Sequence, residues 1–354
     1  MTRPRSTLVS PAETRYYHCM GRCVRRAFLC GDDERTGRNF DHRKALILQR
    51  LKLLTEVFAI DLCAYAVMSN HYHLVLRLNL ERAAAWTQRE VASHWASIYR
   101  GPPCLDKYLN DFPLSATEEA LLAEHCAIWR RRLTDLSWFM RSLNEFIARQ
   151  ANAEDQCTGH FWEGRFKSQA LLDEAALFTA MAYVDLNPVR AGLAQSLADS
   201  DFTSIQQRLL QLAKRDAPTA ATRMPELLPF AQTIHSQMSD ALPYNLQDYI
   251  DLIDTTGRLA HPLRRSRIGE QVPKLLDMLG IGANEWLATV GHLHVRFRLF
   301  IGSPHRLREC AKARGWHWVK GHAAARRLYV RATPACALSG GPNESRQDGW
   351  LVFK

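Results

Sequence analysis

The chain lacks any apolar run near the roughly 20 residues that a membrane-spanning helix needs. Its first residues carry no apolar core of a secretory signal peptide. It has nine cysteines, an odd number, and no two of them form a Cys-x-x-Cys pair. These absences argue against a membrane protein, a zinc ribbon and a disulfide-stapled secreted domain. They predict a cytoplasmic protein in which Cys19 and Cys23 are ordinary buried thiols.

Positive charge is what the chain has in excess. Its 354 residues include 46 lysines and arginines against 36 aspartates and glutamates, a formal net charge of +10. Hydrophobic residues make up 47% and charged residues 23%, as in globular proteins that fold in water. The basic balance favours a polyanionic partner, either nucleic acid or a membrane surface. The length allows two domains.

Alternating and helical patterns place the elements in the first half of the chain. Strands are expected over residues 16–24, 62–68 and 71–78, the last two forming a hairpin, and a fourth over 165–172. Helices are expected over residues 41–58, 81–99 and 117–152, with a loop or insertion over 104–116. Asp173 is a plausible N-cap for a helix that ends near Leu186, before Asn187 and Pro188.

Two histidines stand two apart in the strand over 71–78. Side chains at i and i+2 share one face of a strand, so His71 and His73 suit two ligands of one metal ion. The opposite face, with Tyr72 and Leu74, should pack under helices and leave the histidine face open to a substrate. Ordinary core or surface histidines are the alternative, and a third ligand has to come from elsewhere.

Tyr183 and Asn187 stand four apart on the predicted helix. Such positions lie on one helix face, within about 6 Å at Cβ, so phenol and amide oxygens could converge on one point. The alternatives are a core aromatic for Tyr183 and a helix C-cap for Asn187. A phenol that attacks a DNA phosphate would keep the phosphodiester energy in a covalent link.

A third pattern interleaves aromatic and basic residues. Trp162 could stack on unpaired bases, while Arg165 and Lys167 could follow phosphates. The alternative is a core strand with solvated cations. Further along, residues 213–245 are richer in Ala, Pro, Thr and Ser and are predicted as a linker. Residues 246–354 form a second, mainly helical and basic unit.

Taken together and in order, these motifs resemble a known family. The chain resembles REP-associated tyrosine transposases, within the wider group of single-tyrosine HUH transposases. The resemblance covers roughly residues 14–205, and the segments that carry it are residues 17–22, 66–76, 136–141, 159–168 and 182–193.

The resemblance implies an α+β fold in which residues 1–212 form a ferredoxin-like HUH catalytic domain with an antiparallel sheet. It implies that His71 and His73 bind Mg²⁺ or Mn²⁺ and that Tyr183 is the nucleophile. In related insertion-sequence transposases a glutamine four residues after the tyrosine is a further ligand. Here that position is Asn187, one methylene shorter. DNA contacts are expected from the segments that carry the resemblance, at Arg22, Trp162, Arg165, Lys167 and Arg190, and from the C-terminal unit.

The expected function is therefore metal-dependent cleavage and rejoining of single-stranded DNA near hairpins, through a 5′-phosphotyrosine, by a monomer rather than a dimer. The main alternative is a non-catalytic regulator that binds DNA or RNA hairpins on the same scaffold. A replication initiator or relaxase shares the chemistry, although relaxases usually place the tyrosine before the histidines. A zinc hydrolase would lack a matched third ligand and a general base.

Overall fold

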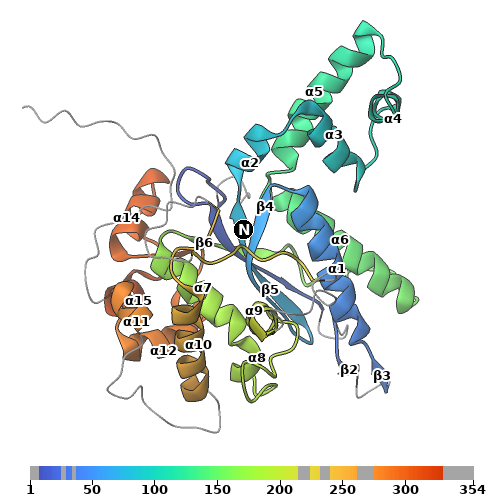
Figure 1. Cartoon of the computed structure of the whole chain (residues 1–354). Helices are drawn as coiled ribbons and strands as arrows, with labels where there is room; N and C mark the ends of the chain where they lie inside the picture. The colour runs from blue at the N-terminus through green and yellow to red at the C-terminus, as the bar shows by residue number, and fades with distance from the viewer. Residues whose placement is uncertain are drawn as a thin grey trace, which may run out of the picture.

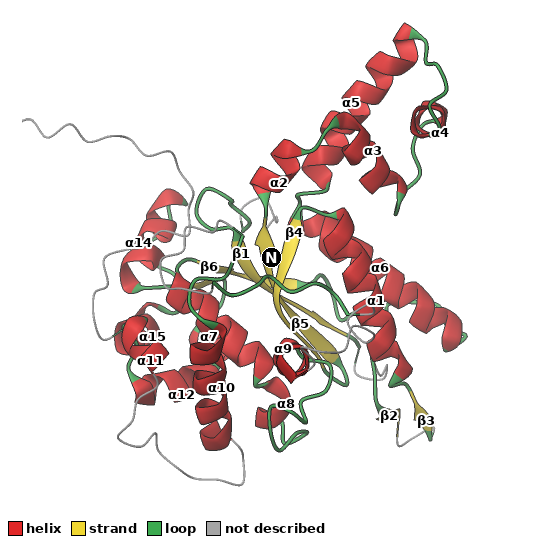
Figure 2. Cartoon of the chain, in the orientation of Figure 1, coloured by secondary structure: helices red, strands yellow, loops and turns green. Residues whose placement is uncertain are grey.

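A mixed five-stranded sheet forms the centre of the computed structural model (Figures 1 and 2). Its strand order is β4-β5-β1-β6-β7. The structure describes residues 8–24, 29–33, 37–213, 224–231, 240–260 and 274–329. Much of the predicted linker and the end of the basic unit lie outside these residues.

Four of the five strands were expected from the sequence. They are β1 (Tyr16–Arg22), β4 (Ile60–Val67), β5 (His71–Leu78) and β6 (Lys167–Leu171). All neighbours among these four run antiparallel, as expected. The fifth strand, β7 (Phe300–Ile301), pairs with β6 in parallel, so the prediction of a purely antiparallel sheet is wrong at this edge. A strand of only two residues is too short to show an alternating pattern in the sequence.

Helices cover both faces of the sheet. On one face lie α1 (His42–Val57) and α6 (Leu136–Glu154), and Tyr72 of β5 donates a hydrogen bond of 2.5 Å to Asn144 of α6. Gly21 lies opposite Tyr72, where a Cβ atom would come within 2.6 Å of the tyrosine ring, so only glycine fits. The apolar face of β5 is thus covered by helices, as predicted.

The histidine face is also largely covered, and it opens to a pocket only near His71 and His73, so the prediction of an open face is confirmed only in part. Helix α7 (Glu174–Asp185) packs against β4 and β5. His73, Val75 and Arg77 of β5 are all buried, and only His71, at the start of the strand, is partly exposed.

An arm of helices projects from the body of the molecule (Figure 1). It consists of α2 (Leu80–Ala85), α3 (Gln88–Ala96), α4 (Pro103–Leu109) and α5 (Ala116–Arg132). Helix α4 lies in the segment predicted as a loop. Its proline stands at the first helical position, where the missing N–H has no helical partner to lose, so Gly-Pro-Pro starts a helix here. The preceding helix α3 has already ended at Ala96.

The remaining elements are short or belong to the second half of the chain. They are β2 (Asp32–Asp33), β3 (Arg38–Asn39), α8 (Asn187–Arg190), α9 (Ser204–Ala213), α10 (Leu246–Ala260), α11 (Lys274–Met278), α12 (Ala283–Gly291), α13 (Leu293–Arg296), α14 (Pro304–Ala313) and α15 (His322–Leu328). Within the described ranges, no helix is both long and apolar enough to cross a membrane. Cys19 and Cys23 are buried, as predicted.

Both ends of α7 are tied to the second half of the chain by carboxylates, Asp173 partly buried and Asp185 fully buried. Asp173 caps the helix by accepting from the Ala176 amide at 2.9 Å, which confirms the predicted N-cap. The same carboxylate accepts from the Ser303 amide at 2.7 Å and the Tyr329 hydroxyl at 2.8 Å. At the other end, the fully buried Asp185 accepts from the Tyr249 hydroxyl of α10 at 2.6 Å. Residues beyond 246 therefore help to position α7.

Candidate functional site

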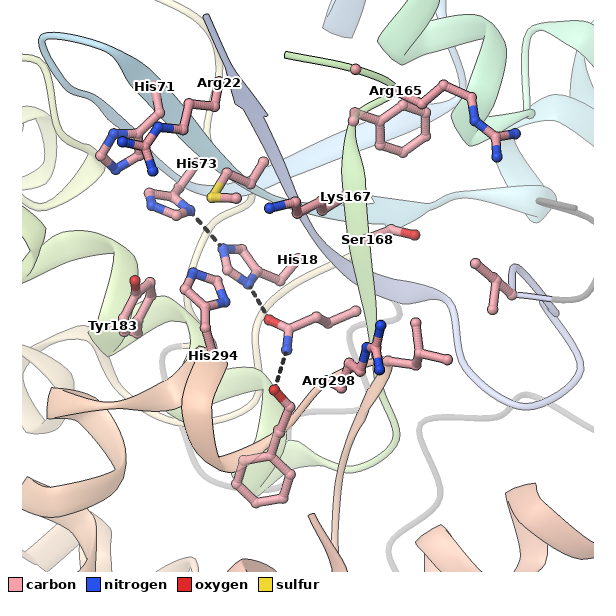
Figure 3. A pocket seen from close by; sticks show the side chains of 17 residues that line it. His18, Arg22, His71, His73, Arg165, Lys167, Ser168, Tyr183, His294 and Arg298 are labelled. Carbon is pink, nitrogen blue, oxygen red and sulfur yellow. Dashed lines mark hydrogen bonds between the residues drawn. The ribbon is translucent and has the colours of Figure 1, made fainter. Parts of the chain in front are cut away.

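A pocket of about 1050 Å³ opens between the histidine face of the sheet, α7 and α13 (Figure 3). The strand registers explain its floor. Arg22 lies opposite His71, Met20 opposite His73, and His18 opposite Gln169. Cross-strand partners point to the same side of a sheet, so three strands contribute alternate residues to one surface.

The structure brings the predicted nucleophile and both predicted metal ligands into this pocket. The ring centroids of His71 and His73 are 4.9 Å apart, and those of His73 and Tyr183 are 5.4 Å apart. Tyr183 projects from α7 and is only 7% exposed. Tyr183, more than a hundred positions after the two histidines in the chain, therefore meets them within one pocket of a single chain.

Three of the predicted DNA contacts also line the pocket. They are Arg22, Arg165 and Lys167, and all three are exposed. Arg298, which the sequence analysis did not single out, also lines the pocket. Arg22 forms an ion pair with Glu163 at 3.5 Å, at the rim. The pocket thus presents positive charge around buried imidazole and phenol groups.

Among the described residues, those that line the pocket do not include the other predicted site residues, Asn187, Arg190 and Trp162. The guanidinium of Arg190 lies over the Tyr183 ring at 4.5 Å and donates to the Gly291 carbonyl at 2.6 Å. Trp162 is half-buried on the opposite face of the sheet, with its indole N–H donated to the Asn144 carbonyl at 2.9 Å. Their roles toward DNA remain predictions.

Besides Arg298, sequence reasoning missed His18, Gln169 and His294. Figure 3 labels the two histidines. The His294 ring, from α13, lies 4.9 Å from that of Tyr183 and 5.7 Å from that of His73. A signal for His18 was present, because His18, Met20 and Arg22 alternate along β1 on one face. No local pattern marked Gln169 or His294, since their position depends on pairing between distant segments.

The hydrogen-bond partners of the buried nitrogen atoms show whether a metal ion fits here. Nε2 of the fully buried His73 has no hydrogen-bond partner among the described residues, and neither has the amide nitrogen of the buried Asn187. His71 Nδ1 is paired with Asn70 Oδ1 at 2.6 Å. An unpartnered buried imidazole nitrogen is the donor that a metal ion takes up, and turning the Asn187 amide would exchange its nitrogen for an oxygen donor. In the described ranges, no three His, Cys, Asp or Glu side chains are grouped to hold a metal ion, so histidine and acidic side chains supply only part of a ligand set.

Burial governs the proton affinity of the pocket groups. It lowers the pKa of His18 to about 3 and the pKa values of His71 and His294 to about 4, and it holds the pKa of His73 well below its usual value. Burial also raises the pKa of Tyr183, an effect that the nearby Arg190 opposes. At neutral pH the imidazoles are therefore uncharged and the phenol is protonated.

These shifts predict that stability falls as the solution becomes acidic. A histidine in the unfolded chain has a pKa of about 6.5, so below that pH the unfolded state binds more protons than the folded state. The stabilisation is complete above about pH 6.5 and is lost as the pH falls toward 4, by up to about 1.4 kcal/mol per pH unit for each buried histidine. For metal-free protein, thermal unfolding should show a falling midpoint between pH 7 and 5.

The matched variants for this measurement are His18→Gln and His305→Gln. His18 is buried in the pocket, with 1% of its surface exposed, whereas the side chain of His305 is exposed on α14. The first variant should flatten the pH dependence, and the second should leave it as in the parent. Equal slopes of the unfolding midpoint against pH in the parent and both variants would contradict the assignment of this pH dependence to the buried histidines.

Comparisons with known proteins add a structural likeness. No protein-family model matches the chain, and no curated protein matches it. Among solved structures, the chain is similar to one described as a REP-associated tyrosine transposase bound to a REP hairpin. The TM-score is 0.34 and the sequence identity 13%, over 62% of this chain and 89% of the other. At that level of similarity, the function has to be argued from the pocket itself.

Proposed function

We propose that this chain is a single-tyrosine transposase of the HUH type, similar to REP-associated tyrosine transposases. Its reaction is the cleavage and rejoining of single-stranded DNA near a hairpin, on a ferredoxin-like catalytic domain. The observation that carries the proposal is the convergence of His71, His73 and Tyr183 in one basic pocket. None of these three residues indicates a function on its own, but this chemistry requires them to lie close together in space.

The proposed step is attack by the Tyr183 hydroxyl oxygen on a DNA phosphorus. The new Oη–P bond forms as the bond from phosphorus to the 3′ oxygen breaks, and the leaving oxygen takes a proton to become a 3′-hydroxyl. The phenol loses its own proton to solvent or a neighbouring base. The product is a 5′-phosphotyrosine, from which a 3′-hydroxyl can later displace the tyrosine and reseal DNA without ATP.

The surrounding side chains have distinct proposed roles. His71 and His73, with Asn187, would hold Mg²⁺ or Mn²⁺, which neutralises charge on the scissile phosphate when bound. Arg190, over the Tyr183 ring, favours the phenolate that attack requires. Arg22, Arg165, Lys167 and Arg298 provide cations for the phosphates that flank the cleaved bond. We propose a cytoplasmic monomer, because one chain supplies both histidines and the tyrosine.

Covalent capture tests this function. Purified full-length protein is mixed with a labelled single-stranded hairpin DNA and Mn²⁺, with a chelator in a parallel reaction, and run on a denaturing gel. A metal-dependent shifted band is expected, and mass spectrometry of its peptides should place the nucleotide on Tyr183. An adduct on another residue would overturn the assignment. Hairpin binding without any adduct would favour the non-catalytic regulator.

A further inference from the structure

We propose that Gln169 and His18 form a positioning chain that fixes His73 in a single tautomer, with the lone pair of Nε2 directed into the pocket. The chain is a line of hydrogen bonds that starts at the Phe297 carbonyl and ends at His73 (Figure 3). Its metal-binding consequence rests on the function proposed above, whereas the tautomer itself does not.

The first link sets the direction of the Gln169 amide. Gln169 Nε2 donates to the Phe297 carbonyl at 3.4 Å, which turns Oε1 toward His18. Oε1 lies 2.9 Å from His18 Nδ1. An amide oxygen can only accept, so His18 Nδ1 must carry the hydrogen.

The second link determines which ring nitrogen of His73 carries the hydrogen. His18 is 1% exposed, and burial without a counter-charge disfavours an imidazolium. A neutral ring with its hydrogen on Nδ1 has a lone pair on Nε2, which lies 3.0 Å from His73 Nδ1. His73 Nδ1 therefore donates, and its Nε2 is left as a bare acceptor. This is the atom that has no hydrogen-bond partner among the described residues.

His71 reaches the same tautomer by a separate and local route. Its Nδ1 pairs with Asn70 Oδ1, again an atom that can only accept. Both predicted ligands are thus prepared to coordinate through Nε2. The two histidines differ in the reach of these hydrogen bonds. The bond of His71 is to the neighbouring residue, whereas the hydrogen bonds that fix His73 run across β1 and β6 to a carbonyl in the C-terminal half of the chain.

A hydrogen bond of this kind orients a ligating histidine and raises its basicity, and its loss commonly weakens metal binding by about 10–100-fold. Replacing Gln169 with methionine removes the oxygen that fixes His18. His18 can then place its hydrogen on Nε2 and donate to His73, which moves the hydrogen of His73 onto its own Nε2. The positioning chain therefore predicts that Gln169 controls the tautomer of His73, a predicted metal ligand with which Gln169 has no direct contact.

The primary test uses metal-free, full-length protein and no DNA. Long-range ¹H–¹⁵N spectra of protein labelled at histidine report which ring nitrogen carries the hydrogen, with the His73 signals assigned by their loss in His73→Gln. We expect His73 to carry hydrogen on Nδ1 in the parent protein and to change or mix tautomers in Gln169→Met and His18→Leu. His18→Gln, whose amide oxygen can accept in place of the imidazole, should restore the parent tautomer.

Gln207→Met is the matched control. Gln207 is equally buried and hydrogen-bonded, to the Tyr65 hydroxyl and the Pro225 carbonyl, but lies outside the pocket. It should lower stability without altering His73. Mn²⁺ titration, followed by electron paramagnetic resonance, should show binding weakened by about 10–100-fold in Gln169→Met and His18→Leu only.

The outcomes separate this inference from the proposed function. A hydrogen on His73 Nε2 in the parent protein, or an unchanged tautomer in both disrupting variants, would overturn the positioning chain. If the tautomers behave as expected but the parent protein binds no Mn²⁺, the chain is supported and the proposed metal-dependent function fails.

Discussion

Tyr183→Phe is expected to abolish DNA cleavage and the covalent adduct, with a loss in rate on the order of 10⁴-fold or more, as for removal of other enzymatic nucleophiles. The substitution removes one oxygen from a ring that packs among His73, His294 and Arg190, so the pocket should keep its shape. Hairpin DNA binding should change little. Cleavage that persists in the variant would refute tyrosine catalysis, whatever the state of the metal.

Mixing two inactive proteins provides the control and tests the monomer at the same time. One protein carries Tyr183→Phe and the other carries both His71→Ala and His73→Ala. If tyrosine and histidines act within one chain, as the pocket indicates, the mixture should stay inactive. Restored cleavage would mean that two chains share their sites and would replace the monomer by a dimer. Light scattering on the same samples gives the mass in solution.

Asp185→Ala is expected to destabilise the fold by about 3–5 kcal/mol, because it removes a buried carboxylate and leaves its donors unpaired. The donors are the Ser204 hydroxyl at 2.5 Å, the Ile205 amide at 3.0 Å and the Tyr249 hydroxyl at 2.6 Å. Urea unfolding of the metal-free protein measures the loss.

The matched control for this prediction is Asp254→Ala. Asp254 lies on α10, four residues before Arg258, and its side chain is 43% exposed in a surface ion pair. Such pairs contribute at most about 1 kcal/mol, so this variant should unfold close to the parent. Equal losses in the two variants would show that Asp185 is not the buried junction between α7, α9 and α10.

Much of the first half of the chain could be predicted because its signals are local. The alternation of residues 71–78 predicted a strand with two histidines on one face, and the Asp173 cap predicted where the tyrosine helix begins. Both features depend on neighbours within a few residues. The same reasoning identified His71, His73 and Tyr183, although only the folded chain brings them together.

The missing parts depend on contacts between distant segments. The expectation of an open histidine face was right only at the pocket, because strand alternation does not reveal which helix packs on which face. His294 enters the pocket from α13, and Gln169 matters through a carbonyl 128 residues later. Residues 246–354 were predicted as a second unit that contacts DNA. In the described ranges, this part of the chain also supplies a strand, a pocket wall and hydrogen bonds to both ends of α7.

The short strand β7 has a consequence for how the protein folds. Ala170 of β6 pairs with Phe300, 130 residues later in the chain. Until those residues have been synthesised, β6 is an open sheet edge, and unpaired edges can recruit strands from other chains. Contacts that close such a long loop also form slowly. The edge beside the pocket is therefore the last part of the sheet to be protected, and unfinished chains are most exposed to mispairing there.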